Sequence, residues 1–255
     1  MNVYTFCAPG AATISDRVAG LFSELPPRLI EISLYGASAA THDRVTGIPG
    51  SFKRSIRGIE KLMGRGVRVA LKSVLMTLNE HEFPAIEELA KRLGVRFRTD
   101  AAIFPTLAGD RGPLGLRVSP ERAVALEMAD PARADEWRDF FHRFRVNPDG
   151  KKIFACNAGR TTFHVDPAGN VFPCLLARMA GYSLKTATFA EGWSDLAHVC
   201  QMEAEGDFPC GRCEKKTLCG FCPGFFELEN GRSHIPSEYA CALGRLRHEF
   251  IVNGR

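Results

Sequence analysis

The spacing of cysteines in the C-terminal part constrains this chain more than any other feature. The sequence holds nine cysteines in 255 residues. Eight of them follow residue 155, and seven of these form the informative pattern: Cys156, Cys174, Cys210, Cys213, Cys219, Cys222 and Cys241. Four of these belong to one block, C-G-R-C-E-K-K-T-L-C-G-F-C. Thiolates spaced so closely are either bridged as disulfides or bound to a soft metal centre.

Cysteine usage also depends on the compartment. The N-terminal residues do not combine a basic stretch, an apolar core and a small-residue cleavage site, so a cytoplasmic location is expected. In that compartment metal binding is favoured over disulfides. Zinc ribbons usually place about 15 or more residues between two Cys-x2-Cys knuckles, whereas five residues separate Cys213 from Cys219. Compact thiolate runs with distant cysteines are typical of iron-sulfur clusters, which we therefore expect, with zinc and disulfides as the alternatives.

Composition and charge exclude several classes of protein. Hydrophobic residues make up 45% of the chain and charged residues 24%, as in an ordinary globular protein with a sizeable core. No segment approaches the roughly 20 continuous apolar residues that cross a bilayer, so no membrane partner is expected. The net charge of +4 comes from basic residues interspersed with acids, and no nucleic-acid face is evident.

The first hundred residues alternate between strands and amphipathic helices. Strands are predicted over 2–6, 29–34, 67–76 and 95–99, and helices over 14–25, 52–63 and 83–93, with Ser51 as the cap of the second helix. Connections long enough for crossovers predict a mostly parallel sheet in an α/β fold, either open or part of a barrel. Ligands of such sheets bind beyond the carboxyl ends of the strands.

The regular alternation stops near Ile103. Proline and glycine punctuate the next stretch, which is interpreted as a linker or a lid with helices over 120–128 and 137–145. From Cys156 onward the chain is expected to form short elements around the cysteines. Strands over 161–165 and 171–174 would be joined by the turn D-P-A-G-N, and a helix would cover 190–202.

The cysteine pattern resembles that of the SPASM domain. The matching features are Cys156, then Gly169-x4-Cys174, then Cys210-x2-Cys213-x5-Cys219-x2-Cys222, and then Cys241, with the hairpin F-H-V-D-P-A-G-N-V-F-P-C between the first two cysteines. This domain is the C-terminal extension of many radical S-adenosylmethionine (SAM) enzymes and carries two auxiliary [4Fe-4S] clusters. Upstream, E-I-S-L-Y-G-A-S-A-A-T-H-D-R-V-T-G-I-P-G-S-F is similar to the family segment that follows the fourth barrel strand.

The resemblance implies a division of the chain into three parts. Residues 1–104 would form part of a parallel (β/α) barrel of the radical SAM type, and residues 105–150 a helical linker. Residues 151–255 would form the SPASM domain. The first residues, N-V-Y-T-F, resemble the third barrel strand, which implies an N-terminally truncated member of the family.

The resemblance also implies which cysteines bind which cluster. Cys210, Cys213, Cys219 and Cys241 would bind the C-terminal cluster. Cys156, Cys174 and Cys222 would bind the other and leave one iron without a thiolate from this set. Some relatives have an eighth cysteine where this chain has Thr162. The last gap of the block is two residues, where family members often have three, so the cluster to which Cys222 belongs stays open. Cys7 and Cys200 are expected to be ordinary thiols.

The motif that makes the radical in this family does not occur in the 255 residues. That motif, Cys-x3-Cys-x2-Cys, holds the cluster that contacts SAM, and the glycine-rich segment that contacts the SAM amino group is also not found. The chain as written is therefore not expected to cleave SAM. Three residues are candidates for SAM contacts: Ser33 at a strand end, Arg44 near a family arginine, and Lys72 on the next strand. For each, the alternative is an ordinary strand-end hydroxyl or a solvated charge.

Two functions from different classes follow. The first is a radical SAM/SPASM enzyme, an oxidoreductase type of chemistry, in which a peptide or protein is modified and a ferredoxin or flavodoxin supplies electrons. The second is a non-catalytic module that carries clusters for electron transfer or binds a peptide. The sequence identifies neither the substrate nor the oligomeric state.

Overall fold

The computed structural model describes residues 4–7, 14–144 and 150–253 and divides the chain into two compact units. The first unit comprises residues 1–103 and 116–119, and the second comprises 104–115 and 120–255. The first boundary lies next to the predicted one at 104. Of the stretch 105–150, residues 116–119 fall in the first unit and the others in the second.

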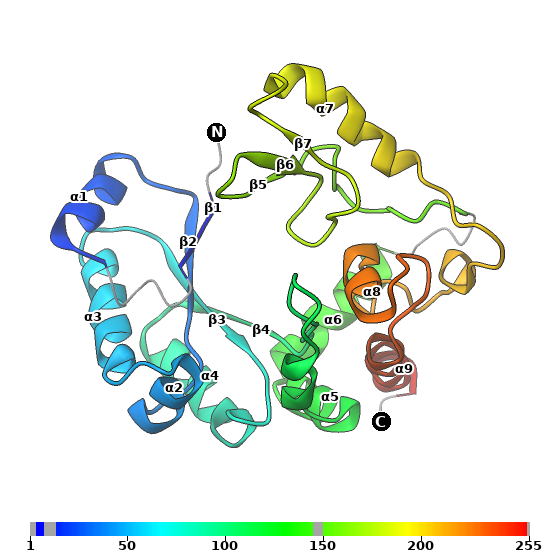
Figure 1. Ribbon diagram of the computed structural model, residues 1–255. Coiled ribbons are helices and arrows are strands. Elements are labelled where there is room, and N and C mark those ends of the chain that lie inside the picture. The colour runs from blue at the N-terminus through cyan, green and yellow to red at the C-terminus, as the bar shows by residue number, and fades with distance from the viewer. Residues whose placement is uncertain (1–3, 8–13, 145–149, 254–255) are drawn as a thin grey trace. The chain divides into compact units, whose positions relative to one another are not determined.

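A four-stranded parallel sheet forms the centre of the first unit (Figure 1). Its strands are adjacent in the order in which they occur in the chain: β1 (Tyr4–Cys7), β2 (Leu29–Ser33), β3 (Val69–Val74) and β4 (Arg96–Asp100). Residues 2 and 3 of the predicted first strand lie outside the described residues. Consecutive parallel neighbours require a crossover between each pair, and helices supply these crossovers.

One face of this sheet is covered by helices α1 (Asp16–Glu24), α3 (Ser51–Met63) and α4 (Phe83–Arg92). Ile30, Ile32, Val69 and Leu71 of the strands form one buried cluster with Ala19, Ile59, Leu62 and Ala90 of the helices. The apolar residues of α3 recur at helical spacing, and this spacing brings Ile59 and Leu62 to the same face. The alternation in β2 leaves Glu31 and Ser33 on the opposite face of the sheet.

The start of α3 differs from the sequence-based expectation of a Ser51 cap. The residue before the helix is Gly50, at φ +76°, and no side chain of its own caps the helix. Instead, the Asp43 carboxylate of helix α2 (Ala39–Thr46) accepts hydrogen bonds from the Phe52 amide, at 2.8 Å, and from the Ser51 hydroxyl, at 2.9 Å. The bond from the Phe52 amide is the main reason why the pKa of Asp43 is lowered. A capping residue eight positions earlier could not be found from local sequence signals.

The second unit contains a small antiparallel sheet and several helices. The sheet has the order β5 (His164–Val165), β6 (Asn170–Phe172) and β7 (Tyr182–Ser183). The first two strands form the predicted hairpin, and β7 was not expected. Asp166 accepts hydrogen bonds from the amides of Ala168 and Asn170, both at 2.9 Å, and so closes the turn.

Three helices of the second unit pack together: α5 (Pro120–Met128), α6 (Pro131–Arg143) and α9 (Glu238–Asn253). Helix α5 has the predicted bounds. Helix α6 starts six residues earlier than expected, because Asp130 caps it and Pro131 occupies its first turn; Arg145, its predicted end, lies outside the described residues. Helix α7 (Phe189–Ala197) and a 3-10 turn (His198–Gln201) cover all of the predicted 190–202 except its last residue. Helices α8 (Pro223–Asn230) and α9 were not predicted.

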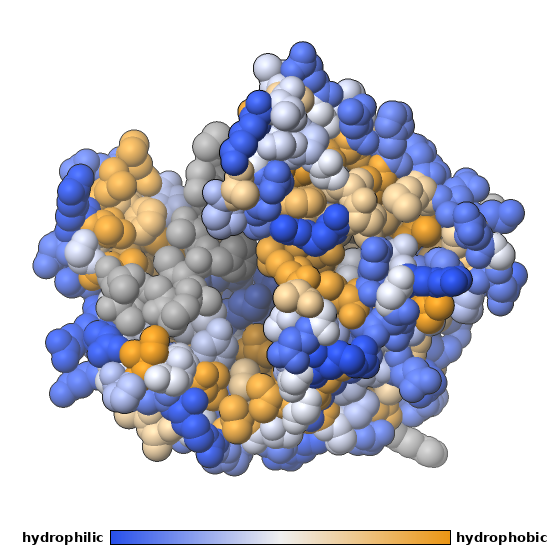
Figure 2. All heavy atoms as spheres, viewed as in Figure 1, coloured by the Kyte–Doolittle hydropathy of each residue, from blue (hydrophilic) through white to orange (hydrophobic). Residues whose placement is uncertain are grey.

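Apolar side chains are also exposed on the first unit. Figure 2 shows hydrophobic atoms over α1, where Leu21 is 51% exposed and Leu25, the residue that ends the helix, is 71% exposed. Among the residues that the structure describes, no helix has the length and apolar content needed to cross a membrane.

The buried cluster predicts a clear difference between two leucines. Leu62 of α3 is fully buried in the cluster. Leu62→Ala should lower the free energy of unfolding by about 2–5 kcal/mol, because it removes buried methyl groups and leaves a cavity. Leu21→Ala is the matched control and should change it by no more than about 0.5 kcal/mol. Urea unfolding followed by circular dichroism measures both, and equal losses would contradict this description of the core.

Candidate metal centres

The seven cysteines of the predicted pattern are free thiols in the structure. Cys156 is exposed, Cys210 is buried, and the other five are partly buried. The disulfide alternative therefore has no support among these seven residues. Four of them line one cavity, and the charges of Cys174 and Cys156 act on Cys222.

Four thiols line one cavity of about 240 Å³ in the second unit. They come from separate elements: Cys210 from the 3-10 turn Pro209–Arg212, Cys213 and Cys219 from the following loop, and Cys241 from α9. The remaining lining residues are Lys215, Lys216, Phe221, Phe226 and Arg245. The cavity thus combines four soft ligands with basic and aromatic side chains.

Backbone hydrogen bonds hold the loop that carries two of these thiols. The Cys213 carbonyl accepts from the Lys216 amide at 3.2 Å, and the Lys215 carbonyl accepts from the Cys219 amide at 3.2 Å. Helix α9 approaches this loop at Gly244, where an added Cβ would lie 2.6 Å from the Cys219 Cβ. Glycine at this position therefore permits the contact between the helix and the loop.

Burial dominates the electrostatics of these thiols. It raises the pKa of Cys219 to about 12 and that of Cys210 to about 11, and the neighbouring cysteines of the cavity raise both further. Burial is also the main reason why the pKa of Cys241 is raised. In the chain without metal these thiols are therefore protonated, because a buried thiolate lacks solvation.

Cys222, Cys174 and Cys156 form the second group. Burial is the main reason why the pKa of the Cys222 thiol is raised. Backbone hydrogen bonds from Phe225 and Gly224 lower this pKa, whereas the charges of Cys174 and Cys156 raise it. Cys222 immediately precedes α8, so its sulfur lies at a helix N-terminus, where a thiolate is stabilised. Cys174 Sγ accepts a hydrogen bond from the Ala177 amide at 3.2 Å. The side chains of Cys7 and Cys200, which were expected to be ordinary thiols, lie outside the part that the structure describes.

The four thiols of the cavity suit a metal cluster better than a single metal ion. A single zinc ion holds its four ligands at about 2.0–2.3 Å around one point. Within residues 4–7, 14–144 and 150–253, no group of three or more His, Cys, Asp or Glu side chains is arranged to hold a metal ion in this way. The four thiols instead surround a cavity. Thiolate ligands around a larger space suit an iron-sulfur cluster.

A buried ion pair, which the sequence did not reveal, lies beside the first group. Arg247 of α9 donates to both oxygens of the Glu127 carboxylate on α5, at 2.8 and 2.7 Å, and its third nitrogen donates to the Leu218 carbonyl at 2.7 Å. Leu218 directly precedes Cys219. The two charged residues are 120 positions apart in the sequence, and no local signal links them.

Two of the three predicted SAM-contact residues lie together. Ser33 at the end of β2 and Lys72 of β3 are register partners, both partly buried, on the sheet face opposite the helices. Glu31 lies on the same face and forms an ion pair with Arg98 of β4, at 3.5 Å. Arg44, in contrast, is exposed on α2, and its guanidinium donates to the Leu78 carbonyl. Ser33 and Lys72 are therefore placed where a ligand of the sheet could reach them.

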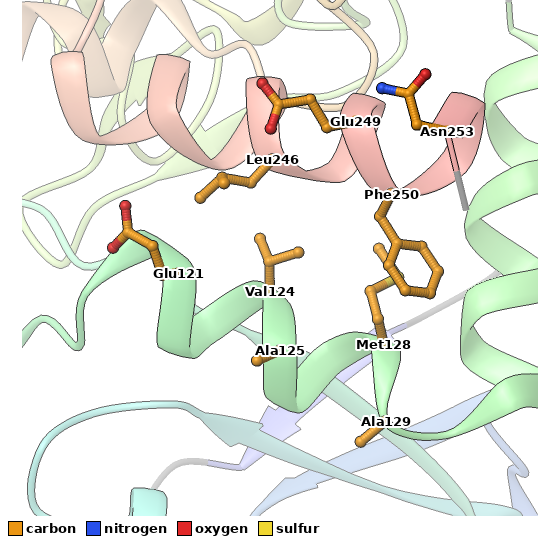
Figure 3. A pocket seen from close by; sticks show the side chains of 9 residues that line it. All are labelled: Glu121, Val124, Ala125, Met128, Ala129, Leu246, Glu249, Phe250 and Asn253. Atoms are coloured by element: carbon orange, nitrogen blue, oxygen red, sulfur yellow. The ribbon is translucent and has the colours of Figure 1, made fainter. Parts of the chain in front are cut away.

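A larger cavity, of about 710 Å³, contains none of the cysteines. It lies between α5 and α9, where Val124 and Met128 face Leu246 and Phe250 (Figure 3). Its lining is mostly apolar, with Glu121 and Glu249 as the charged members. The cavity that carries soft metal ligands is thus the smaller one.

Known proteins resemble this chain along most of its length, although no family model matches it. The AdoMet-dependent heme synthase of Nitratidesulfovibrio vulgaris is 25% identical over 248 residues, which cover 83% of this chain and 64% of that protein. The mycofactocin maturase MftC of Mycobacterium ulcerans is 29% identical over 201 residues, which cover 74% of this chain and 54% of that protein. The chain spans between 61% and 66% of the length of three heme synthases that it matches.

A solved structure shares the fold. The structure described as native anSMEcpe with bound AdoMet and Kp18Cys peptide superimposes with a TM-score of 0.64 at 15% identity and covers 96% of this chain and 73% of that one. The predicted α/β fold with a parallel sheet is confirmed by this likeness and by the strand order.

The raised pKa values predict slow alkylation of the buried thiols. Only the thiolate reacts with iodoacetamide, so at pH 8 Cys219 of the folded, metal-free chain should react more than about 100-fold more slowly than in urea, given the tenfold loss of thiolate per pKa unit. The exposed Cys156 is the control and should differ by less than about tenfold between the two conditions. Mass spectrometry of the labelled peptides measures both rates. Similar protection of the two residues would contradict the described burial.

Proposed function

We propose that this chain, which its relatives and structural neighbours indicate to be a radical SAM/SPASM-type protein, holds two [4Fe-4S] clusters in its second unit and serves the radical modification of a peptide or protein. The observation that carries the proposal is the arrangement of four thiols around one cavity. Such a cavity has no role in an ordinary hydrophobic core, because four thiols and two lysines are poor packing residues compared with aliphatic side chains.

The ligands of each cluster follow from the two groups of thiols. Cys210, Cys213, Cys219 and Cys241 would hold the C-terminal cluster, and Cys156, Cys174 and Cys222 would hold the other. Support comes from mutual electrostatic effects, since Cys219 is influenced by Cys241, Cys210 and Cys213, whereas Cys222 is influenced by Cys174 and Cys156. The second set offers three thiols, so one iron would keep a position for another ligand.

The residues of the protein would support this chemistry by limiting the access of water to the clusters and by positioning SAM and the substrate. When bound, the clusters would pass electrons or hold a substrate at an open iron. Phe221 and Phe226 line the first cavity, and their apolar rings would limit the access of water to a cluster bound there. The exposed position of Cys156 places the three-thiol site nearer to solvent, where a substrate side chain could reach it. Ser33 and Lys72 would contact the carboxylate of SAM; Arg44 could do so only by giving up its bond to Leu78.

A peptide is the substrate class that the comparisons favour. MftC is named as a maturase, and anSMEcpe was solved with a peptide. Heme synthases act on a different class of molecule and are about equally similar to the chain. We propose a peptide or protein substrate and a ferredoxin or flavodoxin as the electron donor.

A non-catalytic cluster-carrying module is the second candidate. One observation favours it, namely that the 255 residues contain no Cys-x3-Cys-x2-Cys. In this case the clusters would transfer electrons or bind a peptide without SAM cleavage. The two candidates share the metal centres and differ in whether the clusters serve the radical modification of a peptide.

Metal analysis tests the centres. Protein reconstituted anaerobically should be brown and contain about 6–8 irons per chain. Cys213→Ala removes one ligand of the proposed C-terminal cluster and should lower the iron content by about half. Cys200→Ala, the control, should retain all the iron. Stoichiometric zinc without iron, or equal losses in both variants, would refute the assignment.

The fate of SAM tests the chemistry. Residues 1–255 supply no three-cysteine loop for a cluster that contacts SAM, so reconstituted protein with dithionite and SAM should form no 5′-deoxyadenosine above a protein-free control. Liquid chromatography with mass spectrometry detects the product. Robust production would mean that SAM reacts at the proposed three-thiol site, and Cys174→Ala should then abolish it.

A further inference from the structure

Lys216 is a buried lysine inside the cavity of four thiols. It lies midway along the five-residue spacing between Cys213 and Cys219, and only 7% of the residue is exposed. Lysine is almost never buried to this extent unless it has a partner. The environment of Lys216 therefore calls for a physical explanation.

Aromatic rings form the apolar side of that environment. Lys216 Nζ lies 4.1 Å from the centroid of the Phe221 ring and 5.6 Å from that of Phe208. Both rings offer a negative face to the ammonium, a contact that gains strength where water is excluded. In the described part of the chain, Lys216 is not found in an ion pair with a carboxylate.

The neighbouring lysine provides a direct contrast. Lys215 pairs with Glu214 at 2.9 Å, and its side chain is 32% exposed. Its charge is therefore neutralised close by and screened by solvent. Arg245 also lines the cavity but is exposed. Of these three basic residues, Lys216 alone is buried.

The cysteines supply the negative charge around Lys216. Burial lowers the pKa of Lys216, and the charges of Cys210, Cys219 and Cys213 raise it. Ligation converts these thiols to thiolates, and an adjacent negative charge favours the protonated amine. A cluster with four thiolates would thus have a buried ammonium beside it.

We propose that the ammonium of Lys216 raises the reduction potential of the cluster held by Cys210, Cys213, Cys219 and Cys241. This inference rests on the proposed function, because it requires that cluster. Reduction adds one electron from an external donor and changes no bond, so it makes the site more negative by one charge. A fixed positive charge in a water-poor cavity favours the more negative state. The same charge at Lys215 would be ineffective, because Glu214 offsets it.

The test compares substitutions at two adjacent lysines. Lys216→Met removes the charge and keeps the length of the side chain, Lys216→Arg keeps the charge, and Lys215→Met is the matched control. Each full-length variant is reconstituted anaerobically, its iron is quantified, and dithionite titration is followed by electron paramagnetic resonance. Cys213→Ala identifies which signal belongs to the C-terminal cluster.

Lys216→Met should keep its iron and shift the reduction equilibrium of that cluster about tenfold toward the oxidised form, or about 59 mV for one electron. Lys216→Arg and Lys215→Met should each shift it less than threefold, as should the signal of the other cluster in every variant. An unchanged potential in iron-replete Lys216→Met would overturn the inference. Loss of iron in both Lys216→Met and Lys216→Gln would also overturn it, in favour of a structural role. Iron-free wild-type protein would refute the proposed function itself.

Discussion

The buried contact among Arg247, Glu127 and Leu218 is the interaction on which the cysteine-rich unit depends most. One guanidinium joins α9 to α5 and to the loop carbonyl before Cys219, and it also lies 4.4 Å from the Trp137 ring of α6. Both charged side chains are at most 5% exposed. Removing one partner of such a pair costs about 3–5 kcal/mol, because the other charge stays buried without compensation. Four separate segments are thus held by one side chain.

Helix α9 brings this contact to the thiols through its own periodicity. Cys241, Gly244 and Arg247 follow one another at intervals of three residues, so they lie along neighbouring positions of the helix surface. Cys241 lines the cavity, Gly244 permits close approach to Cys219, and Arg247 bonds to the carbonyl of Leu218. A shift of the helix by one residue would change all three contacts together. The position of two proposed ligands therefore depends on the register of one helix.

The sequence predicted what depends on local periodicity and missed what depends on distant partners. Strands β2 to β4 and helices α1, α3 and α4 came from apolar spacing, which the buried cluster enforces. The predicted cap of α3 was wrong, because Asp43 and not Ser51 accepts the hydrogen bonds at the start of this helix. The resemblance to the SPASM domain, not spacing by itself, divided the thiols into two sets, and this division remains a proposal. The sequence could not distinguish Lys215 from Lys216. Their burial differs because the turn of the loop brings only Lys216 to the rings of Phe208 and Phe221.

The charge balance of the cavity suggests why its thiols are buried at all. A thiol that must lose its proton to bind metal gains nothing from burial, and burial here raises the pKa of Cys219 to about 12. Four thiolates without a metal would be unstable in this space, so the buried thiols keep their protons until a metal centre replaces them. Binding should therefore release protons and weaken as the pH falls. Lys216 and Arg245 partly offset the resulting negative charge. Burial thus couples the ionisation of these ligands to the arrival of the metal.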